Sequence, residues 1–556
     1  MNYKQSSYNS SDNKPDNNSA DKNNGCRNTA AQTTERYSYV NYCYSSETVR
    51  NLDYLMVEQG IIENSYQLMT RAAQALLDFI NLNYPKIKHL TIVCGAGNNA
   101  GDGYVLARLA KSQKKEPRLK VQLISVLDLK SSPEGLSGDA RRAYKDWLEC
   151  GGSIDSMADA HFLSTDLIVD ALIGTGLNRA LEDEWYDAVV TINASPKPVL
   201  SVDIPSGLDA NTGATHGIAV NATQTITFIA QKMGMYTAQA RNHCGKIIFA
   251  SLGVPDRLYQ QAEHSAILLE WTNIARKLPC RSPVSNKGDH GHLLIIGGDY
   301  GMAGACRIAG EAALRTGSGL VSIATRKENV NAITSTRPEL MVHGVDSGDD
   351  LEPLLEKATA IAIGPGLGTG QWGRALLDKI IKHLKHQPDT DDHDSCINCV
   401  IDADALNIMA KRNLVIQNRN IIYTPHFGEA CRLLKCSSEC PSQETDRFAM
   451  LRSLREKYYG TFILKGAGTL INFGEDTAVC PYGNEGMASA GMGDCLTGII
   501  GALLAQKLPA VEAAQVGVCL HAKAGDLAAQ EGKAGMIVSD LFPKIRQLLN
   551  NKLLKE

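Results

Sequence analysis

The chain has 556 residues, 44% of them hydrophobic and 21% charged. It is longer than a single hydrophobic core usually supports, so this composition predicts a globular protein with two domains. Acidic and basic residues nearly balance, at 60 and 56, which excludes an overall field that would draw the chain onto nucleic acid or an anionic membrane.

Neither a signal peptide nor a run of eighteen apolar residues is visible, and the fifteen cysteines are scattered, which suits reduced thiols. We therefore expect a cytoplasmic protein with small-molecule partners and no membrane or nucleic-acid partner. Residues 1–45 are rich in Asn, Ser, Asp and Lys, and such a composition buries too little apolar surface to offset the entropy of ordering. They are predicted to form a disordered polar tail.

Residues 46–272 read as an α/β domain. Helical patterns cover Glu47–Gly60 and Ser65–Asn83. Short apolar, β-branched runs then alternate with amphipathic stretches, as in a parallel sheet covered by helices. The predicted strands are Leu90–Cys94, Val121–Val126, Asp166–Leu172, Pro198–Val202 and Gln224–Ile229.

A second α/β series fills residues 273–556, after a polar stretch that ends at Asp289. Within it, residues 386–399 are acidic and polar and are predicted to form a solvated surface insertion. The predicted strands are His292–Ile296, Val321–Ala324, Ala360–Ile363, Val400–Ile401, Asn420–Tyr423, Phe462–Leu464 and Thr469–Phe473.

Three polar turns follow strands of the first domain. Residues 95–103 read GAGNNAGDG and are interpreted as a glycine-rich loop before a helix that starts near Tyr104. Such a loop and helix N-terminus favour an anionic group such as phosphate. The other two turns follow Asp170 and Asp203, and carboxyl ends of parallel strands meet in one crevice, so these turns can share one site. Asn99, Asp170, Asp203 and Ser206 would supply oxygen ligands for a hard cation and an acid or base.

A single Asp after a strand often only caps the next helix. The three segments together, GAGNNAGDG, VDALIGTGLNR and VDIPSGLDANTG, resemble the signature segments of NAD(P)H-hydrate epimerases, and the similarity extends over about residues 46–270. The resemblance implies a Rossmann-like three-layer αβα fold. Ala100 departs from the usual glycine of the family but removes no polar ligand.

The resemblance also assigns roles in this domain. It implies a potassium ion held by Asn99, Asp170 and Ser206, and it makes Asp203 the candidate acid or base. Apart from the resemblance, Lys232 is suggested as an electrostatic helper. The residues implied to contact the hydrated nucleotide are Asn98, Asn99, Ala100, Gly101, Asp102, Gly174, Thr175, Gly176, Leu177, Asn178, Arg179, Ala180 and Asp203.

The second domain carries a phosphoryl-transfer pattern. Gly491 and Gly493 stand at the start of an apolar helix, where exposed amides can stabilise phosphoryl charge, and Asp494 is placed to deprotonate a hydroxyl. No P-loop motif occurs in the sequence. Residues 465–469 read KGAGT between two apolar runs, which predicts a hairpin whose glycines approach a nucleotide and whose Lys465 neutralises phosphate. Gly364–Gly368 and Thr424–Glu429 follow strands on the same rim.

These segments resemble the nucleotide-dependent NAD(P)H-hydrate dehydratases over nearly all of residues 275–556, which implies a ribokinase-like three-layer αβα fold. Phe427 departs from the usual proline. The resemblance implies phosphorylation of the errant hydroxyl with Asp494 as base, then loss of phosphate, with ADP as cosubstrate (ATP is an alternative) and Mg²⁺. The implied substrate contacts are Ala305, Gly366, His426 and Asp494, and the implied nucleotide contacts are Lys465, Gly466, Ala467, Gly468, Thr469 and Gly493.

The whole chain is thus predicted to repair NADHX and NADPHX as a bifunctional enzyme that forms homo-oligomers. Two alternatives remain: a ribokinase-like small-molecule kinase, against which the fused epimerase-like domain argues, and a non-enzymatic binding protein, against which Asn99, Asp170 and Asp203 together argue. Cys396 and Cys399, near Asp392 and His393, lack the spacing of a paired zinc knuckle.

Overall fold

The computed structural model describes residues 41–113, 119–129, 135–160, 162–177, 179–385, 397–436 and 446–550. Most of the predicted tail and of the predicted insertion lies outside these residues. Two boundaries need correction. Tyr42–Tyr44 form strand β1, so ordered structure begins before residue 46, and Asn398–Ile401 form strand β15, so the insertion ends before residue 398. Both strands are fixed by pairing with distant strands, which local composition does not show.

The first domain contains a seven-stranded parallel sheet in the order β4-β3-β2-β5-β6-β7-β9. The predicted strands are confirmed to within a residue or two. The strands are β2 (His89–Cys94), β3 (Lys120–Ser125), β4 (Asp155–Ser156), β5 (Leu167–Ala171), β6 (Val199–Val202), β7 (Gln224–Phe228) and β9 (Lys246–Ala250).

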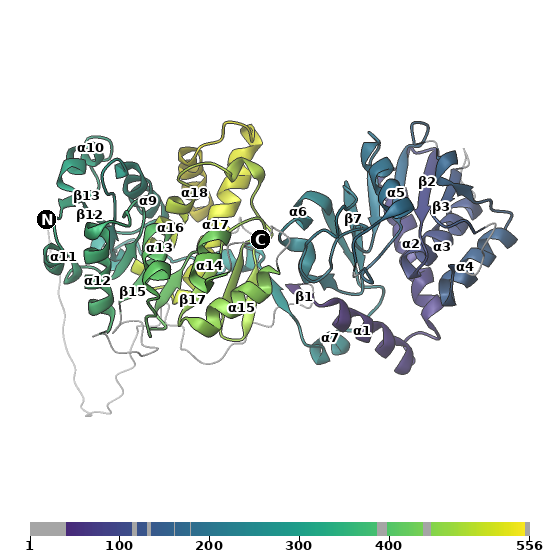
Figure 1. Cartoon of the computed structure of the whole chain (residues 1–556), viewed down its shortest axis with the longest axis horizontal. Helices are drawn as coiled ribbons and strands as arrows, with labels where there is room; N and C mark the ends of the chain where they lie inside the picture. The colour runs from purple at the N-terminus through teal and green to yellow at the C-terminus, as the bar shows by residue number, and fades with distance from the viewer. Residues whose placement is uncertain are drawn as a thin grey trace, which may run out of the picture. The chain divides into compact units, whose positions relative to one another are not determined.

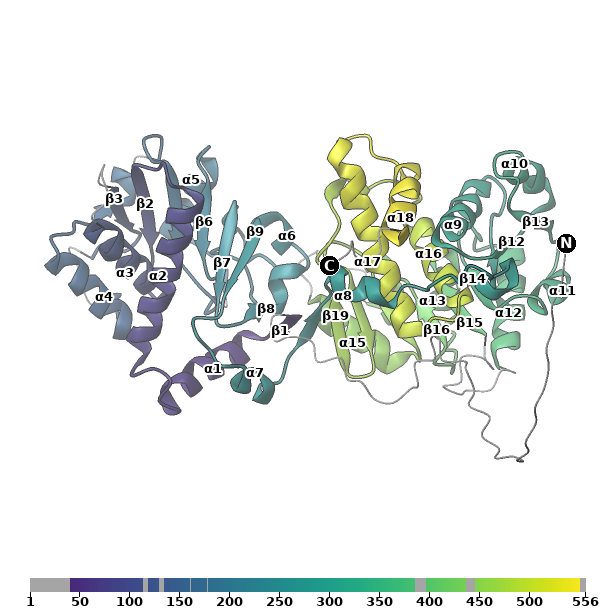
Figure 2. The ribbon, with the colours of Figure 1, turned by 180° about the vertical axis from the view of Figure 1, so that it is seen from behind.

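Helices cover both faces of this sheet (Figures 1 and 2). One buried cluster joins the sheet to α1–α4, and a second joins its other face to α5. The predicted helix Ser65–Asn83 is confirmed as α2, whose buried residues recur at helical spacing and whose first turn is capped by Asn64. The helices are α1 (Ser46–Glu58), α2 (Ser65–Asn83), α3 (Asn98–Ser112), α4 (Gly138–Glu149), α5 (Asp183–Ala194), α6 (Ala240–His243) and α7 (Asp256–Gln261).

The second domain is built on a larger sheet, in the order β13-β12-β11-β14-β15-β16-β17-β18-β19-β10-β1-β8. From β13 to β17 the neighbouring strands are parallel, and β17, β18 and β19 form an antiparallel meander. The strands of this domain are β11 (His292–Ile296), β12 (Leu320–Thr325), β13 (Met341–Gly344), β14 (Ala360–Ile363), β15 (Asn398–Ile401), β16 (Ile421–Tyr423), β17 (Thr461–Leu464), β18 (Leu470–Phe473) and β19 (Asp476–Val479).

Successive side chains of each strand point to opposite faces of the sheet, and each face is covered by a layer of helices. Leu293 of β11 faces α16, whereas Leu294 and Ile296 join a core with α12–α15. Helices α9 and α17 pack against α16, and α18 packs against α9 and α17 (Figure 2). The helices are α8 (Trp271–Ile274), α9 (Ala303–Thr316), α10 (Val330–Thr334), α11 (Glu352–Leu355), α12 (Gln371–Lys385), α13 (Ala403–Arg412), α14 (Phe427–Leu434), α15 (Arg447–Lys457), α16 (Met492–Ala505), α17 (Ala510–Ala528) and α18 (Leu541–Asn550).

The larger sheet also takes in three short strands from before residue 272. Strand β10 (Ala266–Leu268) pairs with β19, and β1 joins β10 to β8 (Gln231–Lys232). The pattern of apolar runs does not predict this, because two- and three-residue strands leave almost no periodicity in the sequence.

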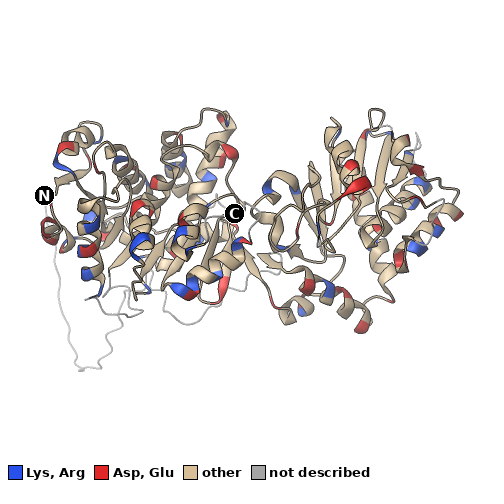
Figure 3. Cartoon of the chain, in the orientation of Figure 1, with Lys and Arg blue, Asp and Glu red and all other residues tan. Residues whose placement is uncertain are grey.

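Acidic and basic residues alternate along the described helices without a large segment of one sign (Figure 3). Among the described residues, no helix combines the length and the apolar character that crossing a bilayer requires.

Candidate active sites

The first candidate site lies where the strand order of the first sheet reverses. The chain passes from β2 outward to β3 and β4, then returns to β5 on the other side of β2. Ligands of open parallel sheets bind outside the carboxyl ends of the strands at such a reversal. The segments after β2, β5 and β6, which the sequence singled out, all begin at this edge.

The segment after β2 differs from its prediction in one respect. Helix α3 begins at Asn98, not near Tyr104, so Asn98–Asp102 form its first turn rather than a loop. Only Gly95–Gly97 precede the helix, and Gly97 occupies the capping position without a side-chain cap. Gly101 and Gly103 lie within this helix, where the lack of a side chain lets α3 pack closely on its neighbours. A Cβ on Gly103, for example, would lie 2.7 Å from Cys94 Sγ.

Asp170 and Ser206 form a buried network at the ends of β5 and β6. The Ser206 hydroxyl donates to Asp170 Oδ1 at 2.6 Å, and its amide donates to Oδ2 at 2.9 Å. Ser201 Oγ also donates to Oδ2, at 2.7 Å. Burial raises the pKa of Asp170, against these hydrogen bonds, which favour the ionised form. The carboxylate is therefore held by dipoles, with no basic side chain paired to it among the described residues.

Asn99 lies beside this network. A Cβ on Gly174 would lie 3.4 Å from Asn99 Oδ1, and the next residue back, Ile173, donates its amide to Ser206 Oγ at 2.9 Å. Asn99 is 6% exposed, and its Nδ2 atom is buried without a hydrogen-bond partner in the described structure. The structure thus brings Asn99, Asp170 and Ser206 together, as the sequence predicted.

Asp203 is held in place by Lys232. The Lys232 ammonium is fully buried, forms an ion pair with Asp203, and donates to Thr227 Oγ1 and to the Phe228 carbonyl, each at 2.9 Å. The Phe228 amide donates to Asp203 Oδ1 at 3.0 Å. Asp203 also has a φ of +66°, in a region that residues other than glycine seldom occupy outside functional sites. The electrostatic role suggested for Lys232 is thus consistent with its direct ion pair with Asp203.

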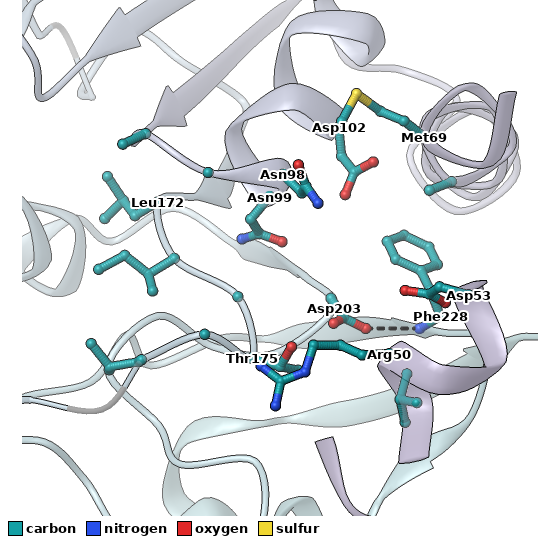
Figure 4. A pocket seen from close by; sticks show the side chains of 18 of the residues that line it. Arg50, Asp53, Met69, Asn98, Asn99, Asp102, Leu172, Thr175, Asp203 and Phe228 are labelled. Carbon is teal, nitrogen blue, oxygen red and sulfur yellow. Dashed lines mark hydrogen bonds between the residues drawn. The ribbon is translucent and has the colours of Figure 1, made fainter. Parts of the chain in front are cut away.

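These groups surround a cavity of about 1220 Å³. Figure 4 shows Asn98, Asn99, Asp102, Thr175 and Asp203 around it. Most of the predicted substrate contacts line it, including Gly174, Gly176, Leu177, Arg179 and Ala180. Ala100 and Gly101 are instead buried in α3, facing away from solvent, and Asn178 lies outside the described residues.

Two carboxyl groups of this cavity have strongly shifted acidity. Burial raises the pKa of Asp53 to about 7, and the nearby Asp203 charge adds to the shift. Burial raises the pKa of Asp102 well above its usual value, with Asp203 and Asp53 adding to it. Asp53 was missed from the sequence. Its position gives a usable indication, because it shares the inward stripe of α1 with Val49, Leu52 and Met56.

The second candidate site lies on the matching edge of the larger sheet. Its order reverses between β11 and β14, and the turns after these strands touch: the Gly298 amide donates to the Pro365 carbonyl at 3.0 Å. A Cβ on Gly366 would lie 3.2 Å from Ala305 Cβ, so two of the predicted substrate contacts are adjacent.

The predicted hairpin is confirmed between β17 and β18. Lys465 at its start is drawn into a buried ion pair: its ammonium lies 2.7 Å from Asp402 Oδ1 and 4.0 Å from Glu429 Oε2. Burial lowers the pKa of Lys465, but these two carboxylates outweigh it and leave the pKa raised. A Cβ on Gly493 would lie 3.5 Å from the Lys465 ammonium, so the hairpin and the glycine-rich helix start meet.

Asp402 is a residue of this site that the sequence analysis missed. It is 1% exposed, and Thr497 of α16 donates to its Oδ2 at 2.7 Å. Burial raises its pKa, but Lys465 and these hydrogen bonds leave it lowered. It directly follows β15, so the reasoning applied to Asp170 and Asp203 would have found it.

His426 starts α14 beside this cluster. Its Nδ1 accepts the amide of Gly428 at 3.0 Å, and Glu429 accepts the His426 amide at 2.8 Å, so the two residues cap the helix reciprocally. Burial lowers the pKa of His426. The residue pairs through its backbone with Lys465, which brings it to the hairpin despite Phe427 at the following position.

Asp494 lies in the first turn of α16, which begins after Gly491 at a φ of +86°. Burial raises the pKa of Asp494 to about 7, Asp402 adds to the shift, and Lys465 opposes it. A carboxyl with a pKa near neutrality is suited to take a proton from a hydroxyl. The structure therefore places a base, a lysine and helix amides at one sheet edge.

The zinc alternative gains no support. Asp392, His393 and Cys396 lie outside the described residues, and within the described residues no three His, Cys, Asp or Glu side chains are grouped to hold a metal. The expectation of reduced thiols needs one correction, because Cys431 is disulfide-bonded. Spacing along the chain does not show which thiols meet in space.

Comparison with known proteins identifies the family of both domains. A family model described as YjeF-related protein N-terminus matches residues 65–234, and one described as NAD(P)H-hydrate dehydratase matches residues 293–547. The bifunctional NAD(P)H-hydrate repair enzyme of Coxiella burnetii is 43% identical over 91% of this chain and 99% of its own length. The corresponding Escherichia coli enzyme is 44% identical over 87% of this chain and 90% of its own length.

Among solved structures, the ADP/ATP-dependent NAD(P)H-hydrate dehydratase from Bacillus subtilis, co-crystallised with ATP and Mg²⁺, is 28% identical, with a TM-score of 0.44 over 50% of this chain and 97% of its own. The matches to the two bacterial relatives cover both domains, and the segments after the strands that form the two sheet-edge sites fall inside the two matched ranges, whereas Asp53 lies before the first range. This chain therefore belongs to the family of bifunctional NAD(P)H-hydrate repair enzymes, which join an epimerase to a nucleotide-dependent dehydratase.

Proposed function

We propose that this chain repairs hydrated NADH and NADPH in two steps. The first domain, residues 46–272, interconverts the R and S forms of NADHX and NADPHX. The second domain, residues 273–556, dehydrates the S form at the expense of ADP, giving AMP and phosphate. The observation that carries the proposal is the placement of Asp494, a carboxyl with a pKa near 7, at a helix N-terminus beside Lys465.

The second domain would act by making a better leaving group. Asp494 takes the proton of the substrate hydroxyl, whose oxygen attacks the terminal phosphorus of ADP while the bond from that phosphorus to AMP breaks. The amides at the start of α16 and the Lys465 ammonium stabilise the charge on the transferred group. Phosphate then leaves with the electrons of the carbon–oxygen bond, and loss of a proton from the neighbouring carbon restores the ring double bond.

The nucleotide and substrate contacts would come from the elements that meet at this edge. Lys465, Gly466, Ala467, Gly468, Thr469 and Gly493 would hold the nucleotide, and Ala305, Gly366, His426 and Asp494 would hold the hydrate. Mg²⁺ would arrive with the nucleotide and neutralise its phosphates. Because Lys465 is paired with Asp402 at 2.7 Å, nucleotide binding would have to share or displace this pair.

The first domain would act by acid–base chemistry at Asp203. The hydrated carbon bears a hydroxyl next to a ring nitrogen, so removal of the hydroxyl proton allows one bond of that carbon to open and reclose from the other face. Lys232 holds the Asp203 carboxyl in place through their ion pair. The wide cavity, which Asn98, Asn99, Asp102, Gly174–Leu177 and Arg179 line in part, would hold the nucleotide.

The residues at the end of β5 fit a potassium ion. Asp170 is a fully buried carboxyl group that no basic side chain pairs with among the described residues, and there the Asn99 amide also has one buried end without a partner. The two ends of an amide exchange by a half-turn, so Asn99 can present its oxygen beside Asp170 and the Ser206 hydroxyl. Potassium bound there would balance the buried charge and attract the pyrophosphate of the nucleotide.

Single-site variants separate the two activities. With purified S hydrate, ADP and Mg²⁺, we expect Asp494→Ala to form no NADH and Asp203→Ala to match the parent. With purified R hydrate, both variants should fail to form NADH beyond the rate of spontaneous epimerisation. Mixing the two variants should restore the conversion, because each supplies the step that the other lacks. No rescue on mixing would contradict the division of labour between the domains.

A further inference from the structure

Asp53 belongs to none of the sequence motifs, yet it lines the cavity of the first domain. It projects from α1, whose start is fixed by Ser45 accepting the amide of Thr48 at 3.1 Å. Val49, Leu52 and Met56 anchor the same face of this helix in the core. The backbone of Asp53 is therefore rigidly placed, and its carboxyl points into the cavity opposite the edge of the sheet (Figure 4).

One oxygen of the Asp53 carboxyl lacks a hydrogen-bond partner among the described residues. Its Oδ1 atom is buried and makes no hydrogen bond in the described structure, as is also true of Nδ2 of Asn99, which is itself 94% buried and lines the same cavity. A buried polar atom without a partner costs about 1–3 kcal/mol. Both residues line the same cavity, so a ligand bound there would lie beside two polar side chains.

The charged groups around Asp53 decide its protonation. Arg50 lines the cavity from the same helix, Asp102 from α3, Asp203 from the turn after β6, and Lys232 from β8. Lys232 is bound to Asp203, so this pair is neutral as a whole. Two further carboxylates, Asp53 and Asp102, would then lie close together in a buried site, and such a site keeps protons on one or both of them.

We propose that Asp53 is a catalytic residue of the epimerisation, the acid that works with Asp203 as the base. This inference rests on the proposed function of the first domain. Asp203 takes the proton of the hydroxyl group, the carbon–nitrogen bond of the ring breaks as the carbon–oxygen double bond forms, and Asp53 gives its proton to the nitrogen that receives the electron pair.

Reclosure reverses each transfer. The chain-end carbonyl turns about the single bond that joins it to the ring-opened chain, and the nitrogen attacks its other face. Asp53 takes back the nitrogen proton, and Asp203 returns a proton to the oxygen. Both side chains end as they began, so the cycle needs no outside oxidant, reductant or proton. Two groups on different elements are needed because the proton leaves one atom and arrives at another.

The test uses the full chain with Asp494→Ala, which blocks dehydration and leaves epimerisation to be followed as conversion of purified R hydrate to S hydrate by chromatography. In that background, Asp53→Asn keeps the shape of the side chain but cannot donate a carboxyl proton. We expect its rate to fall by roughly 100-fold or more. The matched control is Asp78→Asn, the same change on an exposed residue of α2, and its rate should equal that of the parent.

A pH profile separates catalysis from structure. Because burial raises the pKa of Asp53 to about 7, the parent should lose epimerase activity as the pH rises past 7, when the acid has lost its proton. Asp53→Glu should keep much of the activity, with this limb moved along the pH axis. Asp53→Asn should show only a low epimerisation rate that does not fall further as the pH rises past 7. Its melting temperature should be no lower than that of the parent.

The outcomes are distinct. If Asp53→Asn epimerises as fast as the parent, or if it is slow while the profile keeps its alkaline limb, the assignment of Asp53 as the acid is wrong. If the Asp494→Ala parent itself does not interconvert the hydrates, the proposed function of the first domain fails, and the role of Asp53 fails with it.

Discussion

Asp494 is the residue on which the dehydratase account depends. A general base acts in its ionised form, and the pKa of Asp494 is raised to about 7 by burial and by Asp402. Dehydration of S hydrate at saturating ADP should therefore rise with pH through about 7 and level off above it. Asp494→Asn should lower the rate by roughly 100-fold to 10,000-fold.

Initial rates of NADH formation from pH 5.5 to 8.5 provide the measurement, with Asp494→Glu as the control that retains a base. A rate that falls as the pH rises through 7 would mean that Asp494 acts as an acid or that another group limits the reaction.

Ser206 offers a residue-level test of the potassium site. Ser206→Ala removes the hydroxyl that donates to Asp170 at 2.6 Å and leaves the buried carboxylate with one partner fewer. Loss of this hydrogen bond should lower the free energy of unfolding by about 1–3 kcal/mol. In the parent, adding KCl in place of a matched amount of a bulky tetraalkylammonium chloride should raise the melting temperature, since binding to the native state stabilises it.

Ser206→Ala should need a higher KCl concentration than the parent for the same rise in melting temperature. Thermal denaturation measures this rise without any substrate. The potassium assignment does not hold if KCl and the bulky salt act alike on the parent.

Sequence reasoning reached most of these residues for a physical reason. Asp170 lies near the end of β5, and Asp203 and Ser206 lie in the turn after β6. A parallel sheet brings such strand ends together. Asp402 follows β15 in the same way and was recoverable. Asp53 was harder to predict, because an acidic residue on an amphipathic helix is usually solvated and only the packing of α1 turns it inward.

Among the elements, the nucleotide hairpin depends on Arg447 at the start of α15. This buried guanidinium donates to the Ala467, Gly468, Leu464 and Lys465 carbonyls at 2.6–3.2 Å and to Thr237 Oγ1 at 2.6 Å. Burial lowers its pKa to about 10. The carbonyls point inward to Arg447, which leaves the amides of the hairpin available to a ligand.

Arg447→Met should leave these carbonyls without a donor and loosen the hairpin. We expect the KM for ADP to rise about tenfold or more, with a smaller change in kcat, because the contacts at risk serve nucleotide binding. Arg452→Met, an exposed neighbour on α15, is the matched control. An unchanged KM in Arg447→Met would show that the hairpin holds its shape without the guanidinium.

The elements also show where local pattern fails. Helix α2 and most strands of four or more residues were predicted within a residue or two because their pattern extends over several positions, but β9, β13 and β19 were missed. The start of α3 was placed six residues late, since glycines and asparagines are poor helix formers and here packing overrides their propensity. Strands β1, β8 and β10 left no pattern at all.

At the scale of the whole molecule, the predicted boundary at 272/273 separates β19 from its neighbour. Strand β10 pairs with β19 through Ile267 opposite Ala478 and Leu268 opposite Val479. A fragment of residues 273–556 would expose this strand edge, and free edges promote association. We expect this fragment to aggregate at a lower temperature than the full chain. A fragment of residues 263–556, which keeps β10, should aggregate at a temperature between the two.

Light scattering during a thermal ramp compares the two fragments. Equal aggregation temperatures for both fragments and the full chain would show that the β10 edge contributes nothing to the stability of the second domain.

The central claim is that one chain carries both steps, so the most direct measurement is complete repair of a mixture. Full-length protein is added to R and S hydrates of NADH with ADP and Mg²⁺, and the NADH absorbance is followed to its end. The account predicts a fast phase equal to the S fraction and a second phase that recovers the R fraction faster than spontaneous epimerisation. No recovery with either ADP or ATP would contradict the account and favour a small-molecule kinase.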